Sequence, residues 1–313
     1  MREKYLFGPV PSRRLGLSLG VDIVPFKTCT LDCVYCQLAK SSEKTIERKD
    51  YCDVGAVLDE LKKRLDRGLQ ADFITISGSG EPTLNAGLGR IIDGIKKIAD
   101  IPVAILTNGT LLYRQDVRAD CTKADVVLPS LDAGDELTFQ KINRPHLKLS
   151  IEKLIAGLCA FRNEFAGQMW LEVFLLEGFN TDTEQIGKIK GAIERIRPDR
   201  IQLNTATRPT AEAGIKRLDT KKLEAIAEEL GEKCEVVSSS CVVRVPSCVK
   251  RNAQYAVRNT ILSMLKRRPC SLNDICTGLG LGSDEALKYI THFQQRGLVH
   301  SREKDGIVFF RAN

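Results

Sequence analysis

The chain has 313 residues and a formal net charge of +7, and 43% of its residues are hydrophobic and 28% are charged. These proportions exclude a disordered or fibrous protein, and no apolar run reaches the roughly 18–20 residues that span a bilayer. Residues 1–16 are charged and interrupted by proline and glycine, unlike the apolar centre of a signal peptide. We therefore expect a cytoplasmic protein.

Six short β-rich runs alternate with amphipathic helical segments over residues 1–235. The predicted strands are residues 18–24, 72–77, 102–107, 124–130, 170–176 and 200–205, and the predicted helices are residues 57–65, 88–99, 150–165, 183–196 and 219–230. The strands are nearly continuous apolar runs, as expected when helices cover both faces of a parallel sheet. This pattern predicts an α/β fold, a partial (β/α)6 barrel of parallel strands, with the active site at the carboxyl ends of the strands.

The pattern changes beyond residue 235. Residues 236–252 are predicted to be a cysteine-containing linker. Residues 253–313 contain three helical segments and a hairpin, in the order expected for a small winged helix-turn-helix domain. Ser283 is the expected N-cap of the third helix, and Gly297 follows its end.

Positive charge is concentrated in this C-terminal part. From Arg251 to Asn313, ten Lys or Arg residues stand against five Asp or Glu residues. Such an excess suggests a polyanionic partner, although a merely solvated basic face is equally compatible with it.

Three of the eleven cysteines stand close together, at Cys29, Cys33 and Cys36 in "CTLDCVYC". Without an export signal, reduced thiols and metal ligation are favoured over disulfides. A zinc loop, a redox pair and chance are all compatible with this spacing. However, a structural zinc site normally has four protein ligands, and no histidine lies near. Three thiolates on one loop favour an iron–sulfur cluster with one iron left for another ligand.

The loop "CTLDCVYC" resembles the CxxxCxφC loop of the radical S-adenosylmethionine (radical SAM) enzymes. "SGSGEPTL" after the second predicted strand, "TNG" after the third and "PSLDAGDE" after the fourth also resemble motifs of that superfamily. The resemblance covers most of residues 5–210. It implies that Cys29, Cys33 and Cys36 bind a [4Fe-4S] cluster whose fourth iron takes the amino and carboxylate groups of S-adenosylmethionine.

The same resemblance implies three contacts from the second and third motifs. Gly80, which has no Cβ, would let the backbone approach the methionine end of the cofactor. Glu81 would accept hydrogen bonds from the methionine ammonium group. Asn108 is a candidate for contacts to the sugar or carboxylate.

Further contacts are implied for the fourth motif and for the aromatic residue of the loop. Ser130 or Asp132 is a second candidate for the sugar and carboxylate, and Tyr35 is expected near the adenine. Structural roles are equally compatible with two of these residues, because Asp132 also suits the cap of a helix beginning near Gly134 and Tyr35 suits core packing.

The implied chemistry is reductive cleavage of S-adenosylmethionine at the cluster. It yields methionine and a 5′-deoxyadenosyl radical, which abstracts hydrogen from an unidentified substrate. A flavodoxin or ferredoxin is the kind of electron donor that such an enzyme uses.

A second group of cysteines, Cys234, Cys241 and Cys248, recurs at seven-residue spacing. It is a candidate for a second iron–sulfur cluster, or else for three small packing residues at a domain boundary. The remaining cysteines are predicted to be packing residues: Cys52, Cys121, Cys159, Cys270 and Cys276.

The opening "GPVPSRRLGLSLGVDIVP" resembles a branch of Fe–S oxidoreductases similar to wyosine-forming tRNA enzymes. No cysteine precedes Cys29, whereas wyosine synthases carry additional N-terminal cysteines. Three functions are therefore open: a radical SAM enzyme of unassigned substrate, a tRNA- or RNA-modifying enzyme, and an Fe–S-responsive transcription regulator. In these hypotheses the C-terminal domain binds nucleic acid or protein.

Overall fold

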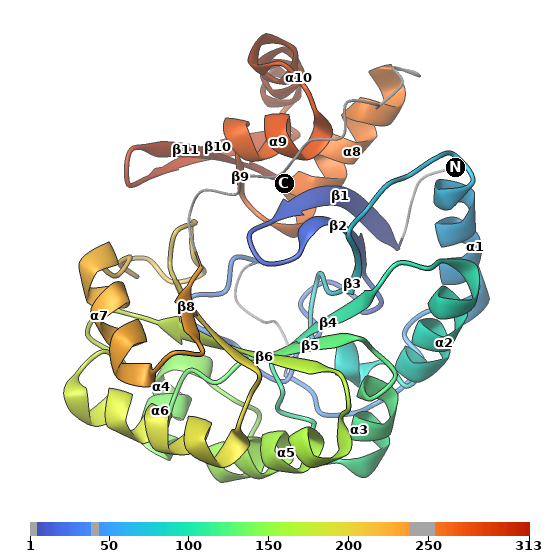
Figure 1. Ribbon diagram of the computed structural model, residues 1–313. Helices are drawn as coiled ribbons and strands as arrows, with labels where there is room; N and C mark the ends of the chain where they lie inside the picture. Colours follow the sequence, from blue (N-terminus) through green and yellow to red (C-terminus); the bar gives the residue numbers. More distant parts are fainter. Residues whose placement is uncertain (1–4, 39–43, 238–253) are drawn as a thin grey trace.

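The computed structural model describes residues 5–38, 44–237 and 254–313, and its largest element is an eight-stranded sheet with the strands in chain order (Figure 1). The strands are β1 (Leu6–Ser12), β2 (Gly16–Val21), β3 (Phe73–Ile76), β4 (Val103–Thr107), β5 (Val126–Pro129), β6 (Gln168–Leu175), β7 (Arg200–Thr205) and β8 (Cys234–Val236). β2 to β8 run parallel, and β1 is antiparallel to β2. In Figure 1 the sheet forms an arc from β1 to β8 that does not close, which is a partial barrel.

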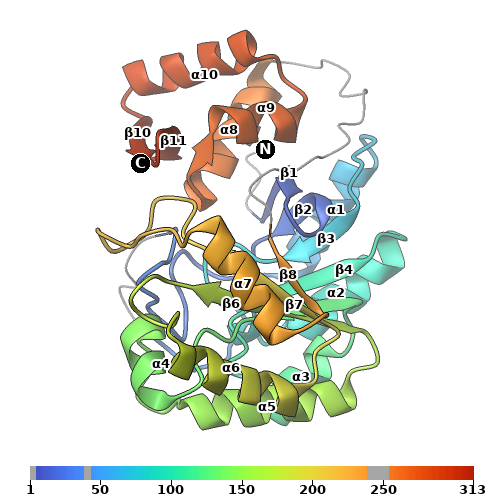
Figure 2. The same ribbon diagram turned by 60° about the vertical axis from the view of Figure 1, so that its left-hand side comes forward.

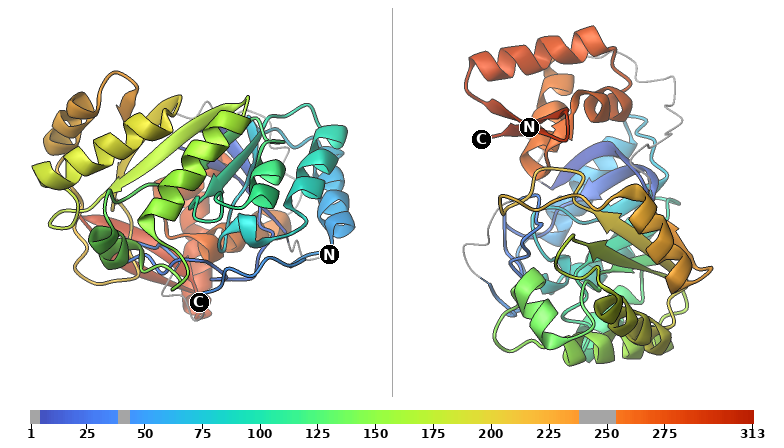
Figure 3. Two further views of the ribbon diagram at one scale, coloured as in Figure 1. Left: turned by 90° about the horizontal axis from the view of Figure 1, so that it is seen from below. Right: turned by 90° about the vertical axis from the view of Figure 1, so that its left-hand side faces the viewer.

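Helices connect the parallel strands and lie on the outer side of the arc (Figures 1 and 3). They are α1 (Val54–Leu65), α2 (Leu88–Ile98), α3 (Gln115–Cys121), α4 (Glu136–Asn143), α5 (Ile151–Glu164), α6 (Thr183–Ile196) and α7 (Thr220–Leu230), with a short 3-10 helix η1 (Pro82–Leu84). Side chains cap several of their first turns, for example Asp53 at α1, Ser150 at α5 and Asp182 at α6. These side chains accept hydrogen bonds from unpaired N–H groups of the first turn and so mark where the capped helices begin. α2 and α3 begin without a side-chain cap.

The predicted partial barrel is confirmed, and the six predicted strands correspond to β2–β7. The first of them spans residues 16–21, earlier than the predicted 18–24. β1 was not predicted, because it contains two prolines and its register is irregular between Phe7 and Val10. α3 and α4, of 7 and 8 residues, are too short to show a clear helical period.

Side chains alternate along the strands between the outer helices and the barrel interior. On β6, Leu171 and Val173 join the core under the helices. On the opposite face, Trp170 and Phe174 belong to two separate apolar groups, and Glu172 lies between them. Along β6, the barrel interior therefore has three successive layers: an apolar layer at Trp170, a polar layer at Glu172 and an aromatic layer at Phe174.

The C-terminal unit follows the barrel. It contains α8 (Gln254–Arg267), β9 (Cys270–Ser271), α9 (Leu272–Leu279), α10 (Ser283–Gln295), β10 (Val299–Lys304) and β11 (Ile307–Ala312). β11 lies between β10 and β9 in an antiparallel sheet. The predicted helices and hairpin are present, but the predicted N-cap is wrong. Gly282 occupies the cap position without a side-chain hydrogen bond, and Ser283 is the first helical residue.

This unit rests on the β1–β2 hairpin, as two views show (Figures 1 and 2). Val10 of β1 packs into the core of the C-terminal unit. Arg267 of α8 pairs with Asp22 at 3.1 Å, and its guanidinium group lies 4.6 Å from the centre of the Phe7 ring. Apolar and ionic contacts therefore both hold the unit against the barrel. No helix in the three described ranges is long and apolar enough to cross a membrane.

Candidate functional site

The three clustered cysteines lie on the loop that follows β2, at the carboxyl ends of the parallel strands. All three cysteine residues are partly exposed. The backbone N–H groups of Asp32 and Val34 donate to the carbonyl groups of Asn143 and Ile142 at the end of α4, at 3.0 and 2.9 Å. The loop is therefore anchored where ligands bind in parallel α/β sheets.

Lys27 places a positive charge beside the third cysteine. Its side chain is only 5% exposed, and its Nζ lies 3.1 Å from Sγ of Cys36. Its backbone has φ +62°, and its N–H donates to the carbonyl of Ser79 at 2.6 Å. Lys27 thus joins the cysteine loop to the turn after β3 and offers a cation to a thiolate.

Two side-chain amides approach the other sulfur atoms. Nδ2 of Asn108 lies 3.5 Å from Sγ of Cys29, and Nδ2 of Asn143 lies 3.5 Å from Sγ of Cys33. Oδ1 of Asn143 is buried and has no hydrogen-bond partner within the described part of the chain. Amide donors to sulfur, and an unsatisfied acceptor beside them, are features of a site that binds a further group.

These residues fit an iron–sulfur cluster better than a single metal ion. Burial raises the pKa of the Cys29 thiol to about 12 and that of Cys33 well above its usual range. Bound metal must therefore displace protons from both thiols. Among the described residues, no three His, Cys, Asp or Glu side chains are arranged to hold one ion. Thiolates distributed over several irons do not need to converge on one point.

Glu81 lies in the turn after β3 and is 2% exposed. Its Oε1 accepts hydrogen bonds from the backbone and hydroxyl of Thr83, at 3.0 and 2.6 Å, and from the hydroxyl of Thr107 at 2.6 Å. Its Oε2 accepts one, from the N–H of Asn108 at 2.7 Å. Burial raises the pKa of Glu81, although these donors act in the opposite direction.

Gly80 is required by packing within the protein, whereas its approach to the cofactor stays a prediction. A Cβ at this position would lie 2.0 Å from the carbonyl oxygen of Thr28. The close approach is therefore between the turn after β3 and the cysteine loop, within the protein itself. This packing keeps Glu81 beside the loop that carries Cys29.

Tyr35 and Asp132 form a buried network. The Tyr35 ring stacks on Phe174 with a centroid distance of 4.0 Å, and its hydroxyl donates to Asp132 at 2.5 Å. Asp132 also accepts from Asn143 at 2.7 Å and from the Phe174 N–H at 3.0 Å. Burial raises the pKa of Asp132 to about 6 and that of Tyr35 well above its usual range. The alternative of a helix cap at Asp132 is wrong, because Asp135 caps α4.

The remaining predicted positions differ in their surroundings. Ser130 is partly exposed at the end of β5, and its hydroxyl has no hydrogen bond to another described residue. Cys234 is partly exposed on β8. Cys241 and Cys248 lie outside the described residues, so the second cysteine group has no geometry to report.

Sequence reasoning missed Lys27, Asn143 and Phe174. Lys27 stands two residues before Cys29 and could have been found as a cation next to the cysteines. Asn143 and Phe174 come from α4 and β6, and only the folded barrel brings them to the loop.

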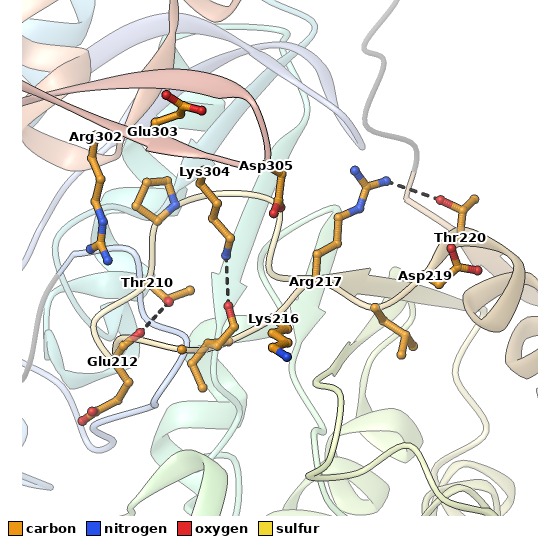
Figure 4. Close-up of a pocket in the computed structure, with 14 residues that line it drawn as sticks. Thr210, Glu212, Lys216, Arg217, Asp219, Thr220, Arg302, Glu303, Lys304 and Asp305 are labelled. Atoms are coloured by element: carbon orange, nitrogen blue, oxygen red, sulfur yellow. Dashed lines mark hydrogen bonds between the residues drawn. The ribbon is translucent and has the colours of Figure 1, made fainter.

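A pocket of about 830 Å³ lies between the segment after β7 and the turn of the β10–β11 hairpin (Figure 4). Lys304 closes one side of it by donating to the carbonyl of Ile215 at 3.3 Å. The segment after β7 that lines this pocket also contacts the cysteine loop, since the N–H of Ala211 donates to the Cys36 carbonyl at 2.8 Å. None of the predicted site residues lines this pocket.

Comparison with known proteins shows which family the chain resembles. The sequence profile of the Radical SAM superfamily matches residues 23–188. A UPF0026 protein of Methanocaldococcus jannaschii is 32% identical over 311 residues, which cover 98% of this chain and 95% of that protein. The solved structure of TYW1 with a lysine-pyruvate adduct bound has a TM-score of 0.53 at 18% identity, and the match covers 72% of this chain and 75% of that one. At that identity the likeness shows the fold alone.

A Brachyspira hyodysenteriae protein named GTPase Obg is 37% identical over 313 residues, which cover 100% of this chain and 46% of that protein. The chain thus spans less than half of that relative. The phosphate-binding pattern GxxxxGK[ST] does not occur in the present sequence.

Proposed function

The chain belongs to the radical SAM superfamily and, within it, to the UPF0026 family, and we propose that Cys29, Cys33 and Cys36 hold its [4Fe-4S] cluster while Glu81 binds S-adenosylmethionine. One observation carries this proposal. Asn108 contacts both motifs, because its N–H lies 2.7 Å from Oε2 of Glu81 and its side-chain amide lies 3.5 Å from Sγ of Cys29.

When bound, the cluster supplies the electron for reductive cleavage of S-adenosylmethionine, and hydrogen abstraction from the substrate follows. The protein residues supply charge and position. Lys27 stabilises negative charge on the sulfur of Cys36, at 3.1 Å. The ring of Tyr35, on the cysteine loop, stacks on Phe174 of β6, and the hydroxyl of Tyr35 donates to Asp132. These contacts fix the position of the Tyr35 ring.

The hydrogen bonds of Glu81 identify the oxygen that is free to bind the cofactor. An ionised carboxylate has about four acceptor positions over its two oxygens. Oε1 already accepts three donors, whereas Oε2 accepts one from the described part of the chain, the N–H of Asn108. The methionine ammonium group would therefore donate to Oε2, on the side where Asn108 faces Cys29.

The test is anaerobic reconstitution with iron and sulfide, followed by dithionite and S-adenosylmethionine. We expect the wild-type protein to release 5′-deoxyadenosine. The variant Cys29→Ala should lose both this release and the bound iron. Cys159→Ala is the matched control, because this partly exposed thiol lies on α5, on the outer side of the barrel. A protein with a full cluster that releases no 5′-deoxyadenosine would contradict the proposal.

We also propose the division into a barrel of residues 1–235, a linker of residues 236–252 and a winged helix-turn-helix domain of residues 253–313. The order of α8, β9, α9, α10 and the β10–β11 hairpin supports it. An RNA substrate, as in the wyosine-type branch, is supported by the quoted motifs and by the basic C-terminal composition. The DNA-binding regulator is less favoured, because Asp284 and Glu285 occupy the first turn of α10 and would repel phosphate.

Binding to bulk tRNA at several salt concentrations tests the RNA alternative with the full chain. Phosphate contacts make affinity fall steeply with salt. Lys288→Glu on α10 and Arg296→Glu directly after it each change an exposed cation, and we expect both to weaken binding. Absence of binding at low salt would remove this alternative.

The second iron–sulfur cluster rests on spacing alone. Iron is counted in a variant in which Cys29, Cys33 and Cys36 are all replaced by alanine. Residual iron that disappears when Cys234 is also replaced would support a second cluster, and an iron-free triple variant would exclude it.

A further inference from the structure

Two arginines enter the polar layer of the barrel from the turn between β1 and β2. Arg14 pairs with Glu172 of β6. Arg13 donates to Oδ1 of Asn204 on β7 at 3.2 Å, and Asn204 in turn donates to Glu172 at 3.1 Å. Glu172 is two residues before Phe174, which is about 7 Å along a strand. The layer thus lies directly beneath the aromatic pair of the candidate site.

Two more arginines approach this layer from the side of the C-terminal unit. Arg208, on the segment after β7, is 9% exposed and pairs with Asp274 of α9 at 3.3 Å. Its Nε is buried and has no hydrogen-bond partner within the described ranges. Arg268, which follows α8, donates to the carbonyl of Pro11 at 3.5 Å.

Contacts along the chain place the four arginines near one another, because Arg208 follows Asn204, which Arg13 contacts, and Arg268 contacts Pro11, two residues before Arg13. Burial, followed by the charges of Arg208 and Arg14, lowers the pKa of Arg13 to about 10, and Arg268 acts in the same direction. Within the described ranges, the carboxylates paired with the four are those of Glu172 and Asp274. Arg13 and Arg268 have no carboxylate partner among the residues that the structure describes. The group therefore has two positive charges in excess.

Uncompensated charge in a largely buried place is unfavourable unless a ligand neutralises it. The planar fork of arginine suits bidentate binding of phosphate or carboxylate. An excess of two positive charges matches a phosphate monoester, which carries about −1.5 to −2 at neutral pH, better than a single carboxylate.

Solvent reaches the polar layer at Glu172, although the side chains of this layer point into the barrel. Arg13, Arg14 and Glu172 are each partly exposed, and so is Ser130, which pairs with Glu172 across β5 and β6. By contrast, the pocket in Figure 4 is lined by equal numbers of acidic and basic side chains and has no such excess.

We propose that Arg13, Arg14, Arg208 and Arg268 form an oxyanion site that binds a phosphate monoester group of the substrate inside the barrel. That the bound molecule is the substrate rests on the proposed function, whereas phosphate binding does not. With the phosphate held in this layer, the rest of the molecule extends past Phe174 toward the cysteine loop.

Isothermal titration calorimetry with inorganic phosphate at constant ionic strength tests the site without cluster, cofactor or reductant. Arg13→Gln and Arg268→Gln are the informative variants. Each removes a charge without leaving a carboxylate unpaired. Arg217→Gln is the matched control, because Arg217 is exposed and, of the residues that the structure describes, donates only to the Thr220 hydroxyl.

We expect each informative variant to bind phosphate at least about tenfold more weakly than the wild type, as for loss of one charge-assisted hydrogen bond. Arg217→Gln should bind like the wild type, and thermal unfolding should show that all three are folded. Absence of phosphate binding in the wild type, or equal affinity in all variants, would overturn the proposal.

Two competitors distinguish the sources of the oxyanion. Acetate displacing phosphate at equal concentration would overturn the choice of a phosphate over a carboxylate. A short oligoribonucleotide without terminal phosphates that binds more tightly than inorganic phosphate would overturn the choice of a monoester over a backbone diester. Release of 5′-deoxyadenosine is measured separately, so failure of the arginine site and failure of the proposed function give different results.

Discussion

A methyl group added at Gly80 would collide with the backbone of the cysteine loop. The new Cβ would lie 2.0 Å from the carbonyl oxygen of Thr28 and 2.9 Å from its carbonyl carbon. The N–H of Glu81 donates to the same oxygen at 2.9 Å. Because the colliding atoms are backbone, no side chain can rotate away, and the turn carrying Glu81 must separate from the loop.

The cost follows from these two contacts. Overpacking a well-packed region costs about 1–3 kcal/mol. Loss of the hydrogen bond between Glu81 and Thr28 adds about 0.5–1.5 kcal/mol. We therefore expect Gly80→Ala to lower the free energy of unfolding by about 1.5–4.5 kcal/mol.

Urea denaturation of the metal-free protein measures this change. Gly187→Ala is the matched control, because a Cβ at this exposed position of α6 would meet nothing within 4 Å. It should stabilise the protein by about 0.5–1 kcal/mol through its better helix propensity. If Gly80→Ala unfolded within about 0.5 kcal/mol of the wild type, the close approach of turn and loop would be refuted.

Three further predictions concern the same region. Tyr35→Phe leaves the buried carboxylate of Asp132 short of one donor and should cost about 1–3 kcal/mol in urea denaturation; an unchanged midpoint would contradict it. Arg267→Gln leaves the buried Asp22 without its cation and should cost about 3 kcal/mol by the same assay, whereas a neutral result would refute a tight interface. Lys27→Met removes the cation beside the Cys36 sulfur, the proposed ligand, and should make the reduction potential of the reconstituted cluster more negative, as followed by redox titration; a positive shift would count against this role.

The strands and long helices of the barrel were predictable because their apolar periodicity is local. α2, for example, buries Leu88 and Ile95 on one face, at the spacing visible in the sequence. β1 and β8 were not predictable in this way, since β1 is interrupted by prolines and β8 has only three residues. Their place at the two ends of the sheet depends on pairing with strands that are already formed.

The cysteine loop, with Glu81 and Asn108, could be recognised in the sequence because each motif follows a strand, and parallel strands bring their carboxyl ends to one edge. Which groups contact the sulfur atoms was decided by tertiary structure. Asn143 reaches Cys33 from 110 residues away, and Arg13 reaches Asn204 across 191 residues. Such contacts leave no local pattern, because they depend on how far the sheet curves and on which side chains its interior then encloses.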